Sequence, residues 1–228
     1  MTEIQLQALG LSNSHLVAYH GSQVHAGILT ELKSLNMAAK SAGFEFTIAS
    51  AHRDFHRQKA IWNAKYSGQR PILNSHNQAV DITQLSSEEI VESIMLFSAL
   101  PGASRHHFGT DLDIYAKNCL ASGASLQLEP WEYQAGGPFY EFSCWLEDNL
   151  ARYGFYKPYD QFRGGVAIEP WHISHVEFAN NMARNLDIAV IADVISKYDV
   201  LGKDTIIGNL NELYQRFVIN VASTNLSK

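Results

Sequence analysis

Two short segments of the sequence bring together residue types that bind metal ions. In the first, residues 101–113 (PGASRHHFGTDLD), two histidines and two aspartates surround a turn that leads into a strand-like stretch. A neutral imidazole and a carboxylate, one on each side of such a turn, can converge on one zinc ion. Side chains alternate along a strand, so Asp111 and Asp113 share a face. The spacing alone therefore leaves open which of the two aspartates joins His106 as a ligand.

The second segment, residues 164–175 (GGVAIEPWHISH), supplies a histidine and a further carboxylate. On a regular strand Glu169 and His172 would face opposite sides, but Pro170 predicts a bulge that turns Glu169 towards His172. Two histidines and one aspartate leave the fourth position of a zinc ion open for water, which is typical of a catalytic site. The chemistry indicated is hydrolysis, with Glu169 as the acid-base residue.

These paired motifs, Ser104-x-His106-x-x-Gly109-x-x-x-Asp113 and Glu169-Pro-Trp-His172, resemble the zinc signature of the VanY-like D-alanyl-D-alanine carboxypeptidases. That family is related to the lysostaphin-type peptidases and the hedgehog domain, and the resemblance extends from about residue 32 to residue 178. It implies that His106, Asp113 and His172 bind Zn²⁺ and that Glu169 is the catalytic base. It also implies that Asp113, not Asp111, is the ligand.

An upstream segment, residues 48–58 (IASAHRDFHRQ), is similar to the substrate-binding stretch of the same family, in which Arg and Gln stand five apart. A carboxypeptidase must bind a free carboxylate and stabilise an oxyanion, and a planar guanidinium suits both tasks. We therefore assign Arg53 to substrate binding and catalysis. Gln58 and Ser104 are its expected hydrogen-bonding partners at the substrate, and Trp171 is expected to wall the site.

Four positions near these motifs stay open. The family often has Tyr in place of His52 and Ala in place of Asp111, so both are departures from its pattern. Asp111 is expected either to orient a ligand or Arg105, or to have a purely structural role. His107 and His175 adjoin the motif residues without matching a ligand position, and neither is predicted to contact zinc.

The composition places limits on partners. The chain has 228 residues, is 46% hydrophobic and carries a formal net charge of −6, with no run of basic residues. This argues against a nucleic-acid or anionic-membrane partner. No apolar stretch approaches the length of a membrane span, and the first residues do not read as a signal peptide, so we expect a cytoplasmic protein, or a periplasmic one if a leader was removed. Cys119 and Cys144 are predicted to be buried free thiols.

Periodicity predicts an α+β fold in which a small antiparallel sheet carries the zinc site and helices pack around it. No linker or repeat divides the chain, so we expect one domain, 1–228, with a motif-bearing core over about 25–180 and a helical extension over about 181–228. The expected helices are 25–42, 54–66, 88–100, 142–153, 186–198 and 205–218. The expected strands are 44–48, 110–115 and one that spans 166–173, interrupted at Pro170.

Aromatic side chains between the two metal motifs are predicted to belong to the core: Trp131, Tyr133, Phe139, Tyr140 and Trp145. The segment 129–138, rich in Gly and aromatic residues, is a candidate lid over the site.

The sequence thus predicts a zinc carboxypeptidase that removes a C-terminal D-amino acid from peptidoglycan stem peptides or muropeptides. One alternative keeps the machinery and shifts the bond, as an L,D-carboxypeptidase or an endopeptidase would. Another is a zinc-stabilised binding module without catalysis, against which Glu169 argues, because a structural zinc site has no use for a base. The sequence does not indicate an oligomeric state.

Overall fold

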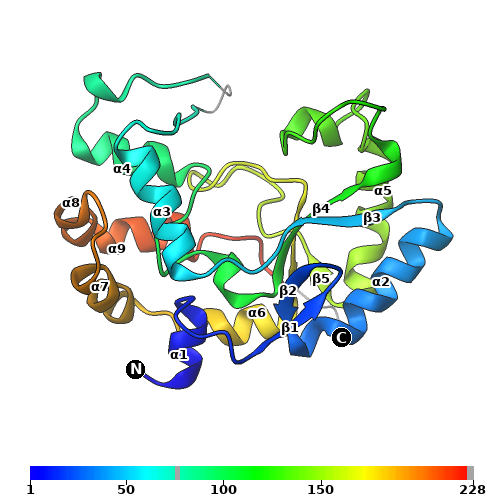
Figure 1. The fold of residues 1–228 in the computed structure, drawn as a ribbon, viewed down its shortest axis with the longest axis horizontal. Coiled ribbons are helices and arrows are strands. Elements are labelled where there is room, and N and C mark those ends of the chain that lie inside the picture. The colour runs from blue at the N-terminus through cyan, green and yellow to red at the C-terminus, as the bar shows by residue number, and fades with distance from the viewer. Residues whose placement is uncertain (75–77, 225–228) are drawn as a thin grey trace.

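The computed structural model describes residues 1–74 and 78–224 and confirms the predicted α+β class. Its centre is an antiparallel sheet with the strand order β3-β4-β6-β5. A separate hairpin, β1 with β2, lies beside this sheet (Figure 1). The strands are β1 (Leu16–Tyr19), β2 (Ser22–His25), β3 (Phe46–Ser50), β4 (Asp111–Ala116), β5 (Phe155–Tyr156) and β6 (His172–His175).

One face of the sheet is covered by the helices α2 (Leu29–Ser41) and α5 (Tyr140–Asn149). Leu112 and Ile114 of β4 point into this layer and are fully buried, together with apolar side chains of both helices. The expected alternation along β4 therefore holds. The polar face of β4, which carries the aspartates, is enclosed as well.

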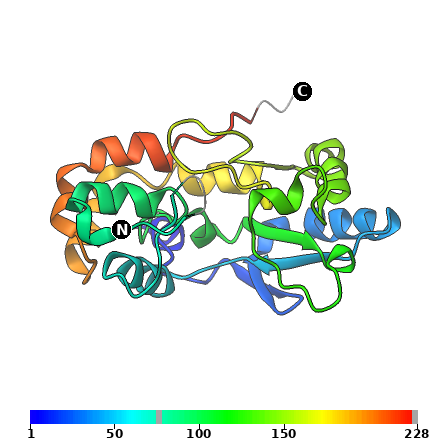
Figure 2. The ribbon, with the colours of Figure 1, turned by 90° about the horizontal axis from the view of Figure 1, so that it is seen from above.

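The remaining helices form a second apolar cluster, on the far side from α2 and α5 (Figures 1 and 2). Its members come from both ends of the chain, so the C-terminal helices complete a core that the N-terminal helices begin. These helices are α1 (Glu3–Ala8), α3 (Phe55–Tyr66), α4 (Ser87–Met95), α6 (Val176–Ala183), α7 (Ile188–Lys197), α8 (Lys203–Gly208) and α9 (Leu210–Leu213), the last followed by a π-helical turn, Tyr214–Val218.

Short 3₁₀ turns connect several of these elements, and one of them carries a metal motif: Ala26–Ile28, Ile82–Gln84, Arg105–Phe108, Lys117–Cys119, Pro130–Tyr133 and Leu150–Tyr153. Asp54 is the N-cap of α3, where its side chain accepts a hydrogen bond from the backbone N–H of Arg57 at 2.7 Å. This cap explains why the predicted helix begins where it does.

Three predicted elements need correction. The helix expected over 88–100 ends at Met95, and the helix expected over 205–218 is interrupted at Asn209. The strand expected over 166–168 is absent, because the N–H of Ala167 bonds to the carbonyl of Leu96 instead of to a neighbouring strand. Of the predicted interrupted strand only β6 forms, with a turn before it rather than a bulge within it.

Some burial predictions were also wrong. Tyr133 and Phe139 are buried as expected, but Trp131 is 47% exposed and Tyr140 is 39% exposed. Both cysteines are free, yet Cys144 is exposed and Cys119 is only half-buried. In the part of the chain that the structure describes, no helix combines the length and the apolar character that a membrane crossing requires.

Candidate active site

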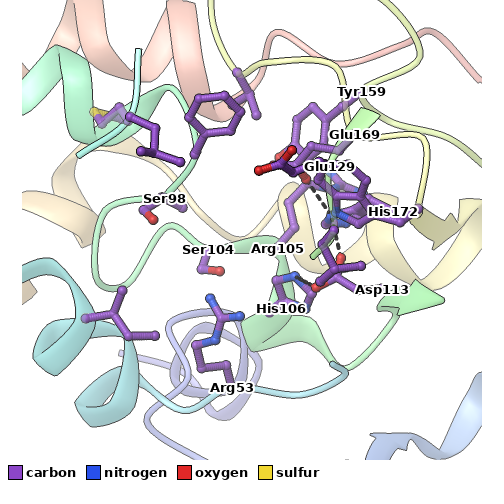
Figure 3. A pocket seen from close by; sticks show the side chains of 18 of the residues that line it. Arg53, Ser98, Ser104, Arg105, His106, Asp113, Glu129, Tyr159, Glu169 and His172 are labelled. Carbon is purple, nitrogen blue, oxygen red and sulfur yellow. Dashed lines mark hydrogen bonds and ion pairs between the residues drawn. The ribbon is translucent and has the colours of Figure 1, made fainter. Parts of the chain in front are cut away.

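Three predicted metal ligands meet at one edge of the central sheet. Asp113 on β4 is the register partner of His172, the first residue of β6. His106 lies in the 3₁₀ turn that precedes β4. One ligand atom from each of the three side chains lies within 4.8 Å of the others, and all three side chains are buried. Two segments that are far apart in the chain therefore bring two imidazoles and a carboxylate together (Figure 3).

Gly109 ends the turn that carries His106, and no other residue fits there. Its φ of +69° lies in the left-handed region. A Cβ at this position would lie 2.5 Å from the side chain of Leu16 and 2.9 Å from the backbone nitrogen of His25. The glycine of the His-x-x-Gly spacing is thus required because the hairpin packs directly against the turn.

Hydrogen bonds select which nitrogen of each histidine faces the site. The Nδ1 of His106 lies 2.9 Å from the carbonyl oxygen of Ala51, which can only accept, so Nδ1 carries the proton and Nε2 is free. That Nε2 is 3.3 Å from Asp113 Oδ2. The Nε2 of His172 lies 3.0 Å from the carboxylate of Asp111, which leaves its Nδ1 to face Asp113 Oδ1 at 3.5 Å.

Behind the triad lies a buried ion pair. Asp111 is fully buried and accepts hydrogen bonds from Arg105 Nε at 2.7 Å and from Thr110 Oγ1 at 2.7 Å. Burial alone would raise the pKa of Asp111, but the charge of Arg105 and the hydrogen bond from His172 hold it well below its usual range. Of the two roles that the sequence left open for Asp111, orienting or purely structural, its contacts match the orienting one, because it accepts from His172 Nε2 and pairs with Arg105.

The donor set fits zinc. Burial alone would lower the pKa of His172, yet its hydrogen bonds to Asp111 and Glu169 and the charge of Asp113 raise it to about 10. Asp113 Oδ1 is buried without a hydrogen-bond partner. A cation bound among these groups would neutralise the carboxylates around His172. It would also give the buried Asp113 Oδ1 a partner. Each histidine is also held through its outer nitrogen, as metal-ligating histidines usually are.

Glu169 reaches the same site by way of a turn. The N–H of His172 bonds to the carbonyl of Glu169 at 3.1 Å, which folds residues 169–172 back on themselves. The N–H of Glu169 bonds to the carbonyl of Tyr159, which anchors the start of the turn. As a result Glu169 Oε2 lies 3.1 Å from His172 Nδ1 (Figure 3). The expected convergence of the two residues is present, although a turn produces it.

A cavity of about 530 Å³ opens from the triad. Residues of the helices α3 and α4 line it, together with residues of the strands β4 and β6. Arg53, Ser104 and Trp171 line it, as predicted for substrate-binding residues. The guanidinium of Arg53 has no carboxylate partner within 4 Å among the described residues. Its Nη1 donates to Gln58 Oε1 at 2.8 Å.

Gln58 does not line the cavity, which corrects the expectation that it contacts substrate. It is fully buried, and its Nε2 donates to the carbonyl of Ala99 at 2.7 Å. Both ends of the amide are therefore occupied, one of them by Arg53. Of the predicted lid, 129–138, Glu129 and Pro130 line the cavity, and Gln127 and Leu128 just before it line the cavity as well.

The other histidines that the sequence left open, His107, His175 and His52, lie outside the triad. His107 Nδ1 donates to the carbonyl of Arg53 at 2.6 Å, and its Nε2 accepts from the N–H of Gly102, so the ring links the two active-site segments. His175 packs against Phe155 and Phe178, and His52 lies beside His15.

Sequence reasoning missed several further lining residues, among them Tyr159 and Lys65. Tyr159 places its ring edge-on to His172, with 5.1 Å between the ring centroids. No local pattern marks it, because it lies in the irregular segment after β5. Lys65 also lines the cavity. It follows Ile61, another lining residue, by four positions on α3, so the two share a helix face, but no pattern in the sequence marks that face as the one that reaches the site.

An α+β fold with a His–Asp–His triad, a neighbouring carboxylate and an unpaired guanidinium in one cavity defines a candidate metal-dependent hydrolase. The model of the VanY family, described as D-alanyl-D-alanine carboxypeptidase, matches residues 21–178. The chain belongs to this family, as the motifs indicated.

Individual relatives agree with this assignment. An uncharacterised protein of Haemophilus influenzae is 35% identical over 122 residues, which are 53% of this chain and 93% of that protein. The putative carboxypeptidase YodJ of Bacillus subtilis is 29% identical, over 64% of this chain and 43% of its own length. A D-alanyl-D-alanine carboxypeptidase of Enterococcus faecalis is 26% identical, over 69% and 50%. The chain thus spans half or less of these two carboxypeptidases.

Solved structures share the fold. VanYB in complex with D-alanine-D-alanine has a TM-score of 0.52 and 21% identity, and the match covers 82% of this chain and 91% of that one. The LdcB LD-carboxypeptidase, described for peptidoglycan recognition, has a TM-score of 0.51 and 21% identity, over 83% and 81%. A point mutant of the D,D-pentapeptidase VanY in complex with Zn(II) has a TM-score of 0.51 and 22% identity, over 77% and 90%.

Proposed function

We propose that this chain is a zinc-dependent carboxypeptidase that removes the C-terminal D-alanine from peptidoglycan stem peptides. The observation that carries the proposal is the joint presence, in one cavity, of the His–Asp–His triad, the carboxylate of Glu169 and the unpaired guanidinium of Arg53. A structural metal site needs neither a free base nor an anion-binding group. Membership of the VanY family and the D-alanine-D-alanine bound in VanYB support the choice of substrate.

In this proposal His106, Asp113 and His172 hold Zn²⁺. The bound ion supplies Lewis acidity, which polarises the scissile carbonyl and acidifies water. The outer hydrogen bonds of both histidines keep their metal-facing nitrogens unprotonated and correctly aimed.

Arg53 binds the terminal carboxylate and so positions the last peptide bond. Gln58 acts as a positioning residue, because its Oε1 accepts from Arg53 and its own amide is anchored to Ala99. Ser104 lines the cavity close to Arg53 in Figure 3 and offers a hydroxyl to the same end of the substrate. Trp171 walls the site.

Glu169 moves the proton. Its carboxylate takes a proton from the attacking water as the oxygen of that water bonds to the carbonyl carbon. It then gives the proton to the departing amine as the C–N bond breaks, so the base is regenerated. Since Glu169 approaches His172 to 3.1 Å, its carboxylate lies at the metal-facing side of the triad.

The test is to incubate the purified protein with stem tri-, tetra- and pentapeptides and to identify the products by mass. We expect loss of one D-alanine from the pentapeptide, abolished by a chelator and restored by zinc. Loss of the terminal residue from the tetrapeptide alone would make the chain an L,D-carboxypeptidase, and internal cleavage would make it an endopeptidase. Because the sequence predicts a cytoplasmic location, we propose soluble muropeptides as the substrates.

The variant Glu169→Gln separates an enzyme from a zinc-stabilised binding module. It keeps the shape of the side chain and removes the base, so turnover should fall about 10²–10⁴-fold while zinc content by elemental analysis is unchanged. Unchanged turnover would remove Glu169 from the mechanism, and loss of zinc would make it a ligand. A chain that binds zinc and peptide without any cleavage would favour the binding module.

A further inference from the structure

The end of the cavity remote from the triad carries positive charge without a counter-charge. Lys65 in the last turn of α3 and Arg70 just after it both line the cavity. Lys65 Nζ donates to Ser98 Oγ at 2.7 Å, and Ser98 lies across the cavity from His172 in Figure 3. Neither cation has an acidic partner within ion-pair distance in residues 1–74 and 78–224.

Lys65 is electrostatically strained in this position. Burial, the largest effect, and the charges of Arg70 and Arg53 together lower its pKa to about 8, and the charge of Glu169 acts in the opposite direction. Three cations that face one cavity repel one another, and an anion placed among them relieves that repulsion. Because a half-buried lysine without a counter-ion costs free energy, the arrangement is informative about a ligand.

The carboxylates of Asp113, Glu129 and Glu169 also line the cavity. Burial lowers the pKa of Arg53 and the charges of Asp113 and Glu169 oppose that effect, so Arg53 lies near the acidic side of the cavity, whereas Lys65 and Arg70 lie at the end of α3 and just after it. A terminal carboxylate bound at Arg53 neutralises only one of the three cations. The other two remain available to a separate anionic group.

The lining next to these two cations is apolar. Ile61 lies one helical turn before Lys65 on α3, and Met95 and Phe97 precede Ser98 in the chain. Apolar walls that lead to a cationic end suit an aliphatic chain that ends in a carboxylate. They offer little to a group that is charged along its whole length.

We propose that Lys65 and Arg70 form an anion subsite that binds a second carboxylate of the peptide substrate, borne on an aliphatic side chain near its C-terminus. This inference rests on the proposed function, since it assumes that a peptide occupies the cavity with its terminal carboxylate at Arg53. It adds a selection rule: peptides that carry two carboxylates near the cleaved bond are preferred to those that carry one.

The experiment compares two peptides that differ only in that side-chain group, a free carboxylate in one and its carboxamide in the other. We expect kcat/KM of the wild type to fall about tenfold on amidation, because a charge-assisted contact is lost. Lys65→Met should cleave both peptides alike, whereas Lys65→Arg should keep the preference. The control is Lys59→Met, which removes the same charge from the same helix at a position that does not line the cavity.

Arg70→Gln provides a second variant at an exposed position, in case Lys65→Met does not fold. It should weaken the preference in the same direction. If the wild type cleaves both peptides equally well, the subsite is overturned and the proposed function stands. If it cleaves neither, the proposed function fails, and calorimetric binding of the same two peptides decides the subsite separately: a preference for the carboxylate that Lys65→Met abolishes supports it, and equal binding overturns it.

Discussion

Replacement of Asp111 by Asn tests whether the buried ion pair behind the triad supports both the fold and the metal site. Asn keeps the size of the side chain but removes its charge and turns one acceptor into a donor. Arg105, only 7% exposed, would keep neutral partners alone, namely Ser174 Oγ at 2.7 Å and Tyr156 Oη at 3.1 Å. Removing one partner of a buried pair costs about 3–5 kcal/mol. Since two neutral acceptors remain, we expect the lower end of that range.

The same substitution acts on zinc through His172. In the wild type the Asp111 carboxylate fixes the His172 ring by accepting from its Nε2 at 3.0 Å. Asn offers at best a neutral acceptor there, and loss of such an outer partner typically costs about 10–100-fold in metal affinity. We therefore expect Asp111→Asn to weaken zinc binding without abolishing it, because no ligand atom is removed.

Two measurements separate these effects. Urea unfolding in the presence of a chelator gives the free energy of unfolding of the metal-free protein, and competition with a chromophoric chelator gives the zinc affinity. The control is Asp193→Asn, which breaks an exposed pair with Lys197 and should change stability by no more than about 0.5 kcal/mol. If Asp111→Asn unfolds like this control and binds zinc like the wild type, the reasoning is refuted.

Three further predictions follow from other contacts. Gln58→Met should lower kcat/KM about tenfold on a peptide with a free C-terminus and leave a C-terminally amidated peptide unaffected, because Arg53 loses its partner; an equal effect on both would show a general packing role. Glu132→Gln should speed amide exchange at Gln127 and Glu129, whose N–H groups bond to that carboxylate, and hydrogen-exchange mass spectrometry would detect it; unchanged protection would contradict this. Burial lowers the pKa of His25 to about 4, so the unfolded chain binds the proton first, and stability should fall as pH falls from 6.5 towards 4. His25→Asn should flatten that dependence in urea unfolding across this range, and an unchanged slope would exclude His25 as its source.

The helices and strands that were predicted correctly are those whose ends and faces are set by their own residues. Helix α3 begins at an aspartate cap and β4 alternates apolar and polar side chains, and both occur where expected. The hairpin β1–β2 was missed because its turn consists of His20 and Gly21, both with positive φ, in place of the Asn-Gly or Asp-Gly that usually marks such a turn. Helix α6 was missed because it starts directly after β6 with no side-chain cap.

The sequence indicates which residues form the candidate site, but not which residues orient them. His106 and His172 stand in recognisable motifs, but the partners that orient them, Ala51 and Asp111, depend on how strands from distant parts of the chain pair. Lys65 was missed for the same reason, since only the packing of α3 against the rest of the protein turns this face of the helix towards the cavity.

The choice between Asp111 and Asp113 shows why tertiary structure must decide. Both aspartates lie on one face of β4, so alternation treats them alike. Arg105 approaches Asp111 to 2.7 Å and neutralises it, whereas Asp113 keeps a buried Oδ1 without a hydrogen-bond partner. Asp113→Asn should therefore lose zinc far more completely than Asp111→Asn, while the metal-free form keeps near wild-type stability. If the two variants bind zinc equally, pairing with Arg105 is not what makes Asp113, and not Asp111, the zinc ligand.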